Sequence, residues 1–502
     1  MNVTRGNIME EKKVRIHLEK HYWPDEIRAR RKRNLGRILA LVGLVLTFVF
    51  GWVVGSTFAT GEPVEETTDF AKLEAIYQIM SEDWYFGKDV LELQTKLIDD
   101  AINGMVDGGG DIHTSYLTSE EAKQFNDSLN MGFVGIGVQY YDSNGTYIIE
   151  RVFRGSPAER AGVLPGDIIF KVNGAEVTGI GSDELAAKVK GENGSIVEID
   201  FLREGVTVSK KITRAPINNT AYGEMIDAET ALLEIYTFGD TTGNEVMDIL
   251  DDFETKGAKR LILDLRDNGG GYLSTLETIG SFFVEKGGIL IQQEFINGTT
   301  DTSKSSGFVT VDWEKIVILV NGNTASASEV LVAALDENLG EKVTVVGTLT
   351  YGKGTVQTQR PFSDQSILKY TIAQWLTPSG KKIDGIGITP DVVVELPAIM
   401  ENGFEPLEEG ETIAPDSVHV AIVSLQEALS FLGYDVDRQD GYYSPKSVEE
   451  FKKYQATYGT TVDGVLTQEW ISRLHADVAR VWHEEMDTRD TQMAKAVELI
   501  HE

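Results

Sequence analysis

Cysteine is absent from this 502-residue chain, which excludes disulfide bonds, thiolate metal sites and a cysteine nucleophile. Histidine is scarce, and none lies between residues 215 and 396, where apolar strands alternate with helical segments. The few histidines show no clustering that would suit a zinc site. A serine nucleophile in this stretch would need a base other than a neighbouring histidine. The histidines stand at positions 17, 21, 113, 419, 475, 483 and 501.

Positive charge is also in short supply, with 46 Lys and Arg against 79 Asp and Glu. Residues 1–37 hold 11 of the basic and 5 of the acidic residues, so the rest of the chain is strongly anionic. An anionic surface repels phosphate backbones and anionic lipid headgroups. We therefore predict no nucleic-acid partner, and any membrane link needs a dedicated segment. A solvated surface is the ordinary interpretation of this acidity.

Such a segment is present at residues 38–60, an uncharged run of 23 residues that follows six cationic side chains. At about 1.5 Å rise per residue the run can cross a hydrocarbon core of about 30 Å. Cationic flanks stay in the cytoplasm, so we predict a single-pass anchor in the cell membrane, with residues 1–37 inside and everything after residue 60 outside. The alternative is a cleaved signal peptide, but the run is long for one and no clear A-x-A site follows.

A helical N-terminal region is predicted for residues 61–130, after a short polar linker. Apolar side chains recur at helical spacing over residues 70–104. Three glycines at 108–110 break this pattern. Thr118 and Glu121 then have the spacing of a capping box, which predicts the start of another helix.

Short apolar strands follow in residues 131–214, with a helical stretch at 182–190. Residues 132–136, 155–158 and 161–174 resemble a PDZ domain in order and spacing. The resemblance implies that N–H groups of the first loop bind the terminal carboxylate of a peptide, which adds a strand to the sheet edge. A gate or spacer that binds no peptide is the alternative. The implied peptide-binding residues are Gly132, Phe133, Val134, Gly135 and Ile136.

An α/β core is indicated by the alternation of strands and helices in residues 215–400. Within it, residues 315–330 predict a strand, a tight turn and a helix start, which places Ser326 and Ser328 among free helix N–H groups. Such amides can hold an oxyanion, and the helix dipole favours developing negative charge. The alternative is that Thr324, Ser326 and Ser328 only cap the helix.

Two further strands of the core end in glycine-rich loops. Residues 269–271 are consecutive glycines that let the backbone approach a ligand and could supply half of an oxyanion hole, although a simple turn is the ordinary interpretation. Lys353 lies between two glycines, and an exposed lysine is the ordinary interpretation there. If Lys353 is packed away from water, its pKa falls and its neutral amine could take the proton of Ser326.

Taken together, these pieces resemble the carboxyl-terminal processing peptidases, also called tail-specific proteases. The resemblance covers about residues 70–396 and keeps one order: a first segment at 104–117, the PDZ domain, and then three core motifs. These are D-L-R-x-N-G-G at 264–270, T-A-S-A-S-E at 324–329 and Y-G-K-G-T-V-Q at 351–357.

The resemblance implies a crotonase-like ββα protease core in the α/β class, with an inserted β-rich PDZ domain and no metal or organic cofactor. It implies Ser326 as nucleophile, Lys353 as general base and Gln357 as the residue that orients the lysine. The implied oxyanion-hole residues are Gly269, Gly270 and Ala327.

One departure concerns the register of the nucleophile. Ser328 lies two residues beyond Ser326 and competes for the same role. The interval from Ser326 to Lys353 is slightly longer than in the family pattern, and we assign the extra residues to the loop 338–342.

The C-terminal part begins with an acidic linker at 401–415, and residues 416–480 resemble a small helical peptidoglycan-binding domain. Ser444 and Thr467 stand where the resemblance expects glycine, which bears on turn geometry and so on glycan binding. The alternative is that the fold serves packing or dimer contacts only. A helical tail is predicted for residues 481–502.

The sequence thus predicts a membrane-anchored serine endopeptidase that works outside the cytoplasm and cleaves protein substrates near their C-termini. The PDZ domain would recognise the substrate C-terminus, and the cell wall is a further expected partner. The family resemblance also implies a homodimer and a part in regulated, signalling-related proteolysis. A non-catalytic envelope scaffold is the rival prediction, whereas a trypsin-like protease with a PDZ domain is excluded by histidine placement and domain order.

Overall fold

The structure is a computed structural model that describes residues 70–130, 132–217, 220–309, 311–459 and 461–502. The predicted membrane anchor, residues 38–60, lies outside the described residues. Within the described ranges, none of the helices combines the length and the apolar character needed to cross a bilayer. The chain divides into two compact units, with the boundary after Ile98.

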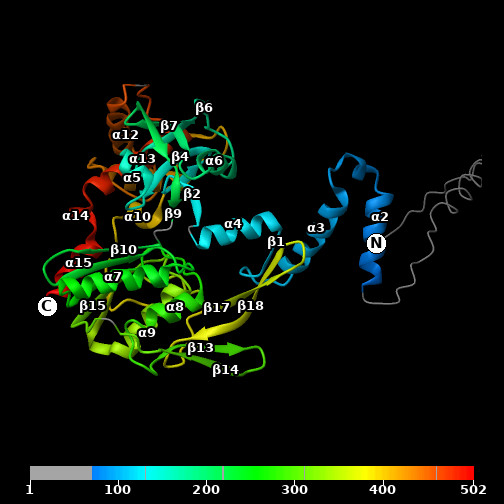
Figure 1. Ribbon diagram of the computed structural model, residues 1–502. Coiled ribbons are helices and arrows are strands. Elements are labelled where there is room, and N and C mark those ends of the chain that lie inside the picture. The colour runs from blue at the N-terminus through cyan, green and yellow to red at the C-terminus, as the bar shows by residue number, and fades with distance from the viewer. Residues whose placement is uncertain (1–69, 131, 218–219, 310, 460) are drawn as a thin grey trace, which may run out of the picture. The chain divides into compact units, whose positions relative to one another are not determined.

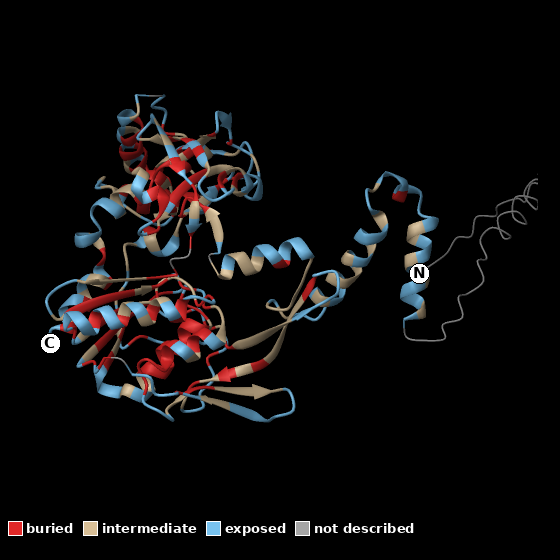
Figure 2. Ribbon diagram, viewed as in Figure 1, coloured by how far each residue is buried: buried red, intermediate tan, exposed pale blue. Residues whose placement is uncertain are grey.

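The described part of the first unit is helical, as predicted. Helix α2 (Ala71–Glu82) is followed by the 3₁₀ helix η1 (Tyr85–Asp89) and the start of α3 (Leu93–Asp107). Neither α2 nor α3 has a buried residue, and their surface is mostly exposed or intermediate in Figure 2. The large apolar side chains exposed here include those of Phe70, Leu73, Ile76, Ile79, Tyr85, Phe86 and Leu91.

The segment between α3 and the PDZ domain enters the second unit through a short strand and a helix. The predicted capping box is confirmed: the Thr118 N–H donates to Glu121 Oε2 at 2.8 Å, and the Glu121 N–H donates to Thr118 Oγ1 at 3.4 Å. It starts helix α4 (Ser119–Leu129). Strand β1 (Ser115–Leu117) precedes it and pairs with a strand of the core.

The PDZ domain is built on a sheet in the order β3-β4-β5-β7-β8, with β6 beside β5. Alternate side chains of β7 are buried, because one face of the sheet packs on the domain core and the other faces solvent. Strand β3 is an edge, so one side of it is open to an added strand. The bounds are β2 Phe133–Gly135, β3 Val138–Ser143, β4 Thr146–Val152, α5 Pro157–Ala161, β5 Ile168–Val172, β6 Ala175–Glu176, α6 Ser182–Val189, β7 Ile196–Arg203, β8 Val206–Thr213 and β9 Ala215–Ile217.

The core sheet has the order β10-β11-β12-β15-β16-β19, and it is parallel except for β10. The bounds are β10 Ala221–Met225, β11 Thr230–Ile235, β12 Arg260–Asp264, β15 Lys315–Val320, β16 Val343–Gly347 and β19 Val392–Val393. Its strands read as continuous apolar runs because both faces are covered. Leu261 and Ile318 pack into one cluster with α7 (Thr242–Lys256), α8 (Leu273–Gly280) and α9 (Ala327–Leu339). The core strands and α8 and α9 appear buried in Figure 2.

The opposite face of the core sheet is covered by the last helix of the chain, α15 (Thr491–Ile500). Ala496 and Ile500 of this helix pack against Ile262 and Val317 of the sheet. The labels in Figure 1 place α15 beside β15. The predicted helical tail is therefore a layer of the protease core, although it lies beyond the C-terminal module in sequence.

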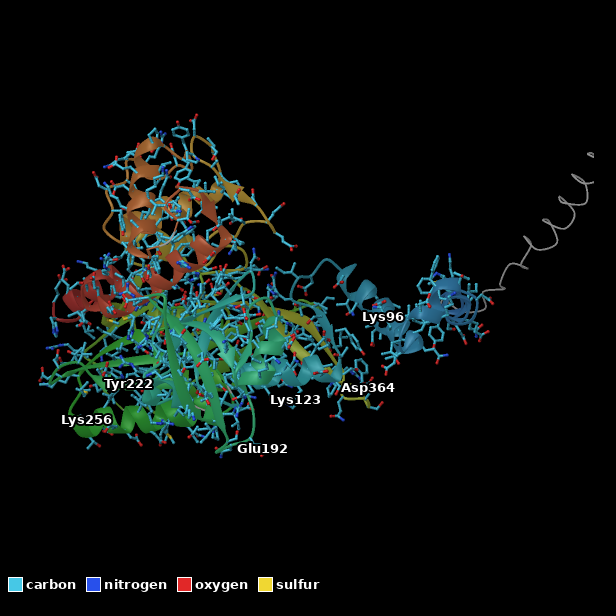
Figure 3. All side chains as sticks on the ribbon, turned by 90° about the horizontal axis from the view of Figure 1, so that it is seen from above. Lys96, Lys123, Glu192, Tyr222, Lys256 and Asp364 are labelled. Carbon is cyan, nitrogen blue, oxygen red and sulfur yellow. The ribbon has the colours of Figure 1, made fainter. Side chains whose placement is uncertain are left out.

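A second, antiparallel sheet carries the lysine motif. Its order is β1-β18-β13-β14, with β17 also paired to β18. The bounds are β13 Ile289–Phe295, β14 Thr300–Lys304, β17 Thr355–Pro361 and β18 Ile367–Leu376. Asp364 is labelled in Figure 3 and lies in the turn between β17 and β18. Lys353 lies two residues before the start of β17.

The C-terminal module consists of α10 (Ala398–Asn402), α11 (Val420–Phe431), α12 (Pro445–Thr457), α13 (Gln468–Glu484) and two short strands. The strands are β20 Thr412–Ile413 and β21 Leu466–Thr467, and α14 is Met486–Arg489. Ser444 and Thr467, where the resemblance expects glycine, have negative φ angles and act as N-caps of α12 and α13. Helix α13 also runs past residue 480, where the sequence places the start of the tail.

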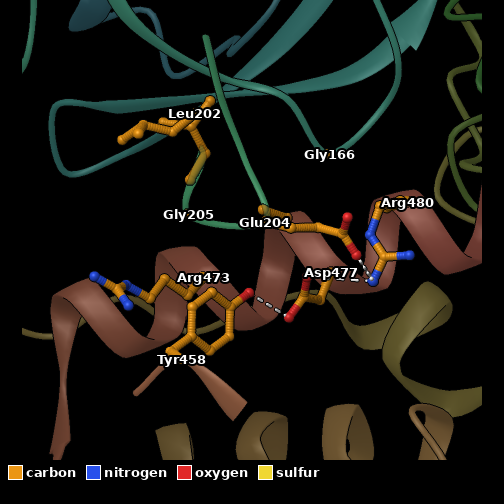
Figure 4. Close-up of a pocket in the computed structure, with 10 residues that line it drawn as sticks. Gly166, Leu202, Glu204, Gly205, Tyr458, Arg473, Asp477 and Arg480 are labelled. Atoms are coloured by element: carbon orange, nitrogen blue, oxygen red, sulfur yellow. Dashed lines mark hydrogen bonds and ion pairs between the residues drawn. The ribbon is translucent and has the colours of Figure 1, made fainter. Parts of the chain in front are cut away.

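Helix α13 packs directly on the PDZ domain. Ser472 Oγ and Gln468 Nε2 both donate to the buried Ser143 Oγ, at 2.9 and 2.8 Å. A cavity of about 120 Å³ lies in this contact, between the PDZ strands β5 and β7 with the turn that follows β7 on one side and α13 with the end of α12 on the other (Figure 4). Arg480 pairs there with Glu204, at 3.5 Å. None of the predicted catalytic residues lines this cavity.

Candidate active site

Ser326 lies at the point where the turn after β15 becomes helix α9. Its backbone has φ 58° and ψ −118°, a conformation that is costly for a residue with a side chain. The turn is fixed by Thr324, whose hydroxyl accepts from the Asn321 N–H at 3.0 Å and donates to the Leu265 carbonyl at 2.9 Å. The result is a partly exposed serine at a helix N-terminus, as the sequence predicts.

Glu329 joins the serine segment to the lysine loop. Its carboxylate is fully buried, and its Oε2 accepts both the Ser326 N–H at 2.8 Å and the Lys353 N–H at 2.9 Å. Its Oε1 accepts from the Thr350 hydroxyl at 2.5 Å and from the Gly352 N–H at 2.7 Å. One oxygen atom thus holds the backbones of the two predicted catalytic residues together. Glu329 was not among the predicted site residues, although it stands in the T-A-S-A-S-E motif at the N3 position of a capping box.

Lys353 is half-buried, and its backbone is fixed on both sides. Its carbonyl accepts from the Trp375 indole N–H at 2.7 Å, and the Glu329 carboxylate holds its N–H. Within the described residues its ammonium has no hydrogen bond and no ion pair. Burial lowers the pKa of Lys353, and the charge of Lys369 lowers it further, while Asp111 and Glu329 oppose the shift. A lowered pKa favours the neutral amine, which is the form that can accept a proton.

The glycine turn lies against the serine. A Cβ atom on Gly270 would come within 2.9 Å of Ser326 Cβ and of the Ala327 nitrogen, so only glycine allows this approach. The Gly270 N–H donates to Asn268 Oδ1 at 2.9 Å. By contrast, in the described ranges the N–H groups of Gly269 and Ala327 have no hydrogen-bond partner. Of the two glycines predicted for the oxyanion hole, Gly269 therefore has the free amide.

Ser328, the competitor of Ser326, is fully buried. Its hydroxyl donates to the Asn268 carbonyl at 2.9 Å. This bond anchors α9 to the glycine turn, and burial keeps the hydroxyl away from solvent.

Gln357 lies on β17 beside the lysine loop but does not contact the lysine side chain by a hydrogen bond. Its Nε2 donates to Thr355 Oγ1 at 2.8 Å and to Thr371 Oγ1 at 3.2 Å. The predicted orienting contact with Lys353 is thus not made in this conformation.

The segment 111–114 also lies at this site, beside β18. This placement was not predicted from the sequence. Thr114 Oγ1 accepts from the Thr371 N–H at 3.2 Å and donates to Asp111 at 2.6 Å. Burial lowers the pKa of His113, and the charge of Lys353 lowers it further, so this histidine lies within electrostatic reach of the lysine. No spacing rule links position 113 to position 353; only the pairing of β1 with β18 does.

The predicted peptide-binding loop of the PDZ domain is partly engaged within the domain. β2 pairs with β9, with Phe133 opposite Ile217 and Gly135 opposite Ala215. Ile136 is buried, and its carbonyl accepts from the Ala158 N–H at 2.8 Å. The Lys190 ammonium lies over the Phe133 ring, 4.7 Å from its centre.

No metal site accompanies these residues: the described part of the chain has no group of His, Asp and Glu side chains that could hold an ion.

Comparison with known proteins gives the family. The model of peptidase family S41 matches residues 229–394, a PDZ domain model matches residues 148–203, and a peptidoglycan binding domain model matches residues 419–474. The carboxy-terminal processing protease CtpA of Bacillus subtilis (strain 168) is 34% identical over 476 residues, 94% of this chain and 99% of that protein. The chain belongs to peptidase family S41.

Other relatives agree with this assignment. A probable CtpA-like serine protease of Staphylococcus aureus (strain COL) is 33% identical over 438 residues, 86% of each chain. Among solved structures, the photosystem II D1 C-terminal processing protease matches 65% of this chain and 87% of its own, with 27% identity and a TM-score of 0.43. The family assignment and the two CtpA relatives make the chain a serine-type endopeptidase of the carboxy-terminal processing group, with PDZ and peptidoglycan-binding domains.

Proposed function

We propose that this S41 peptidase cleaves its substrates with Ser326 as nucleophile and Lys353 as general base. The observation that carries the proposal is the buried Glu329 carboxylate, which holds the backbones of both residues on one oxygen atom. The half-buried Lys353 has no carboxylate partner among the described residues, and burial lowers its pKa, which favours the neutral amine that a general base requires. Ser328 is a poor nucleophile here, because its hydroxyl is buried and bonded to a carbonyl.

The proposed reaction has two stages. In the first, Lys353 Nζ takes the proton of Ser326 Oγ, which attacks the scissile carbonyl carbon. The N–H groups of Ala327 and Gly269 hold the oxyanion, the amine of the leaving peptide takes the proton from Lys353, and an ester on Ser326 remains. In the second, Lys353 takes a proton from a water molecule that attacks the ester, and this proton passes to Ser326 Oγ as the ester bond breaks and the acid product leaves.

The direct test uses soluble residues 61–502 and casein, a flexible protein substrate. Ser326→Ala and Lys353→Ala should each lower turnover by about 1,000-fold or more, because the groups act as a unit. Ser328→Ala should keep most activity and lose about 1 kcal/mol of stability through the lost hydrogen bond. Retained cleavage in Ser326→Ala together with loss in Ser328→Ala would move the nucleophile to Ser328. Full activity of Lys353→Ala with loss in His113→Ala would make His113 the base.

The PDZ domain is proposed to recognise the substrate C-terminus at the edge strand β3, next to residues 132–136. The open edge in the sheet order supports this role, because a peptide can add there as a strand. A peptide ending in a free carboxylate should compete with casein for cleavage, whereas the same peptide with a C-terminal amide should compete weakly. Equal competition by both peptides would contradict carboxylate recognition.

We further propose that residues 38–60 anchor the enzyme in the cell membrane with the peptidase outside the cytoplasm, where it acts in regulated, signalling-related proteolysis. The uncharged run and its cationic flank support this placement. Immunoblots of the membrane fraction should show the intact chain, and a shortened soluble product would indicate a cleaved signal peptide instead.

A homodimer and cell-wall binding complete the proposal. The exposed apolar side chains of α2, including Ile76 and Ile79, support association through the N-terminal helices. Light scattering should give the mass of a dimer, and Ile76→Glu with Ile79→Glu should give a monomer. Retention of the full soluble chain on purified sacculi would test wall binding; no retention would leave the C-terminal module with a packing role only.

A further inference from the structure

Arg266 carries a nearly buried charge directly before the glycine turn of the active site. Its side chain is 12% exposed, and its guanidinium lies between two carboxylates. Asp264, in the same motif, accepts from Nη2 at 2.6 Å and from Nε at 3.0 Å. Asp490 accepts from Nη1 with both oxygens, at 3.0 and 2.8 Å. The second carboxylate thus comes from a residue 224 positions further along the chain.

Asp490 is held rigidly at the start of the tail helix. Its side chain is 3% exposed, and Oδ1 accepts from the Met493 N–H at 2.8 Å as the N-cap of α15. Two further bonds fix the beginning of this helix: Gln492 Nε2 donates to the Val394 carbonyl at 2.9 Å, and the Thr491 hydroxyl donates to the Glu395 carbonyl at 2.6 Å. The carboxylate therefore meets Arg266 without freedom to move away.

Arg266 directly precedes the glycine turn of the active site. Asp267 has φ 60°, and the buried Asn268 donates from Nδ2 to the Ile235 carbonyl at 2.7 Å. The Asn268 carbonyl accepts from the Ala325 N–H at 3.0 Å and from the Ser328 hydroxyl at 2.9 Å. The turn and the nucleophile segment are thus fastened to each other within two residues of Arg266.

The donors of Arg266 are fully satisfied only when the tail is in place, because Nη1 donates to Asp490 and to Gln492 Oε1. Without Asp490 the pair of Arg266 with Asp264 is still neutral, but the buried N–H donors of Nη1 lose their charged acceptor, which costs free energy unless neighbouring groups move to replace it. The residues free to move are those of the turn, because Asp264 lies in the centre of a parallel sheet, at the end of β12. Loss of Asp490 would therefore displace the backbone that supplies the Gly269 amide.

We propose that Asp490 is a positioning residue of the active site, which acts through Arg266 to hold the glycine turn against the nucleophile. On this inference the tail helix α15 is part of the catalytic unit rather than an appendage of the C-terminal module. The inference rests on the proposed roles of Ser326 and Gly269.

The test is Asp490→Asn in the soluble 61–502 chain, with Asp487→Asn as the matched control. Asp487 is an exposed aspartate three residues earlier, on α14. We expect Asp490→Asn to lower kcat on a fluorogenic peptide by about tenfold or more with KM changed by less than about twofold, because the defect is in the transition state. Amide hydrogen exchange should become faster in peptides that span residues 265–272, and the control should match wild type in both measurements.

A second variant, Arg266→Lys, keeps the positive charge but lacks the planar guanidinium that bonds both carboxylates. We expect the same fall in kcat and the same faster exchange for it. Both variants are measured at a temperature at which circular dichroism shows them folded, so either one decides the matter. An unchanged kcat in a folded variant, or unchanged exchange in residues 265–272, would overturn the inference. Failure of the proposed function would look different: wild type itself would not cleave, while the exchange result would still stand.

Discussion

Lys353 is surrounded by charges of both signs, which makes its protonation state adjustable by single substitutions. Burial and the ammonium of Lys369 lower its pKa, while Asp111 and Glu329 act in the opposite direction. A lysine base works only when neutral, so activity should rise with pH as Lys353 loses its proton. The pH at which activity rises therefore reports the pKa of Lys353.

We predict that Lys369→Met moves the rise in kcat/KM to higher pH, because removal of a like charge raises the pKa of Lys353. Asp111→Asn removes an opposite charge and should move the rise to lower pH. The measurement is the pH profile of peptide cleavage between pH 6 and 10, taken as roughly the range in which a perturbed lysine titrates. Shifts in the same direction for both variants would argue that the profile reports another group.

Glu329 should be needed for both stability and activity. Glu329→Gln keeps the shape of the side chain but replaces one acceptor oxygen by an NH₂ group, which cannot accept from the backbone donors it would face. We expect a loss of about 3 kcal/mol in the free energy of unfolding and a fall in turnover of about tenfold or more. Urea denaturation and casein cleavage measure the two effects, with the exposed Glu341→Gln as control.

At the scale of elements, the core depends on how closely β15 and β16 approach at their carboxyl ends. Gly347, the last residue of β16, has φ 133°, and a Cβ atom there would overlap the Val320 carbonyl oxygen. The loops that leave these two strands lead to Ser326 and Lys353. The glycine thus sets the spacing of the two catalytic segments.

Gly347→Ala should therefore destabilise the protein by about 3 kcal/mol or more, through both the strained φ and the overlap. Gly287→Ala is the control, since Gly287 also has a positive φ but open space around it. Thermal unfolding of the two variants measures the difference. Equal melting temperatures would show that the strands adjust without cost.

Local patterns in the sequence predicted most of these elements but not the contacts between distant ones. The capping box at Thr118, the strand-turn-helix around Ser326 and the buried parallel strands follow from side-chain spacing, which acts within a few residues. The approach of His113 to Lys353 and the place of α15 on the core sheet depend on pairing and packing across hundreds of residues. The spacing of side chains along the sequence does not predict such contacts. The role of Gln357 stays a prediction, because its side chain bonds to two threonines instead of the lysine.

At the scale of the whole molecule, a closely packed glycine lies in the interface between the PDZ domain and the C-terminal module. A Cβ atom on Gly166, in the PDZ domain, would overlap the Ala476 carbonyl and approach Arg480 of α13. We predict that Gly166→Ala loosens this interface and speeds hydrogen exchange in α13, while the cores of both modules stay protected.

Gly174→Ala provides the matched control for that prediction, because Gly174 lies in the same PDZ domain with a similar positive φ and nothing within 4 Å. Both substitutions carry the same backbone strain, and only the first meets the other module. Equal exchange in α13 for the two variants would show that the contact with Gly166 does not hold the modules together.

The position of α15 has a consequence for how the enzyme is made. One face of the core sheet is covered only when α15 packs on β12 and β15, after the PDZ domain and the C-terminal module have been synthesised. Contacts of such long sequence separation form late in folding, since the loop between them must close first. A nascent chain that still lacks α15 is therefore missing one layer of its peptidase core. Synthesis order alone would delay proteolysis until α15 has been made and has packed on the sheet.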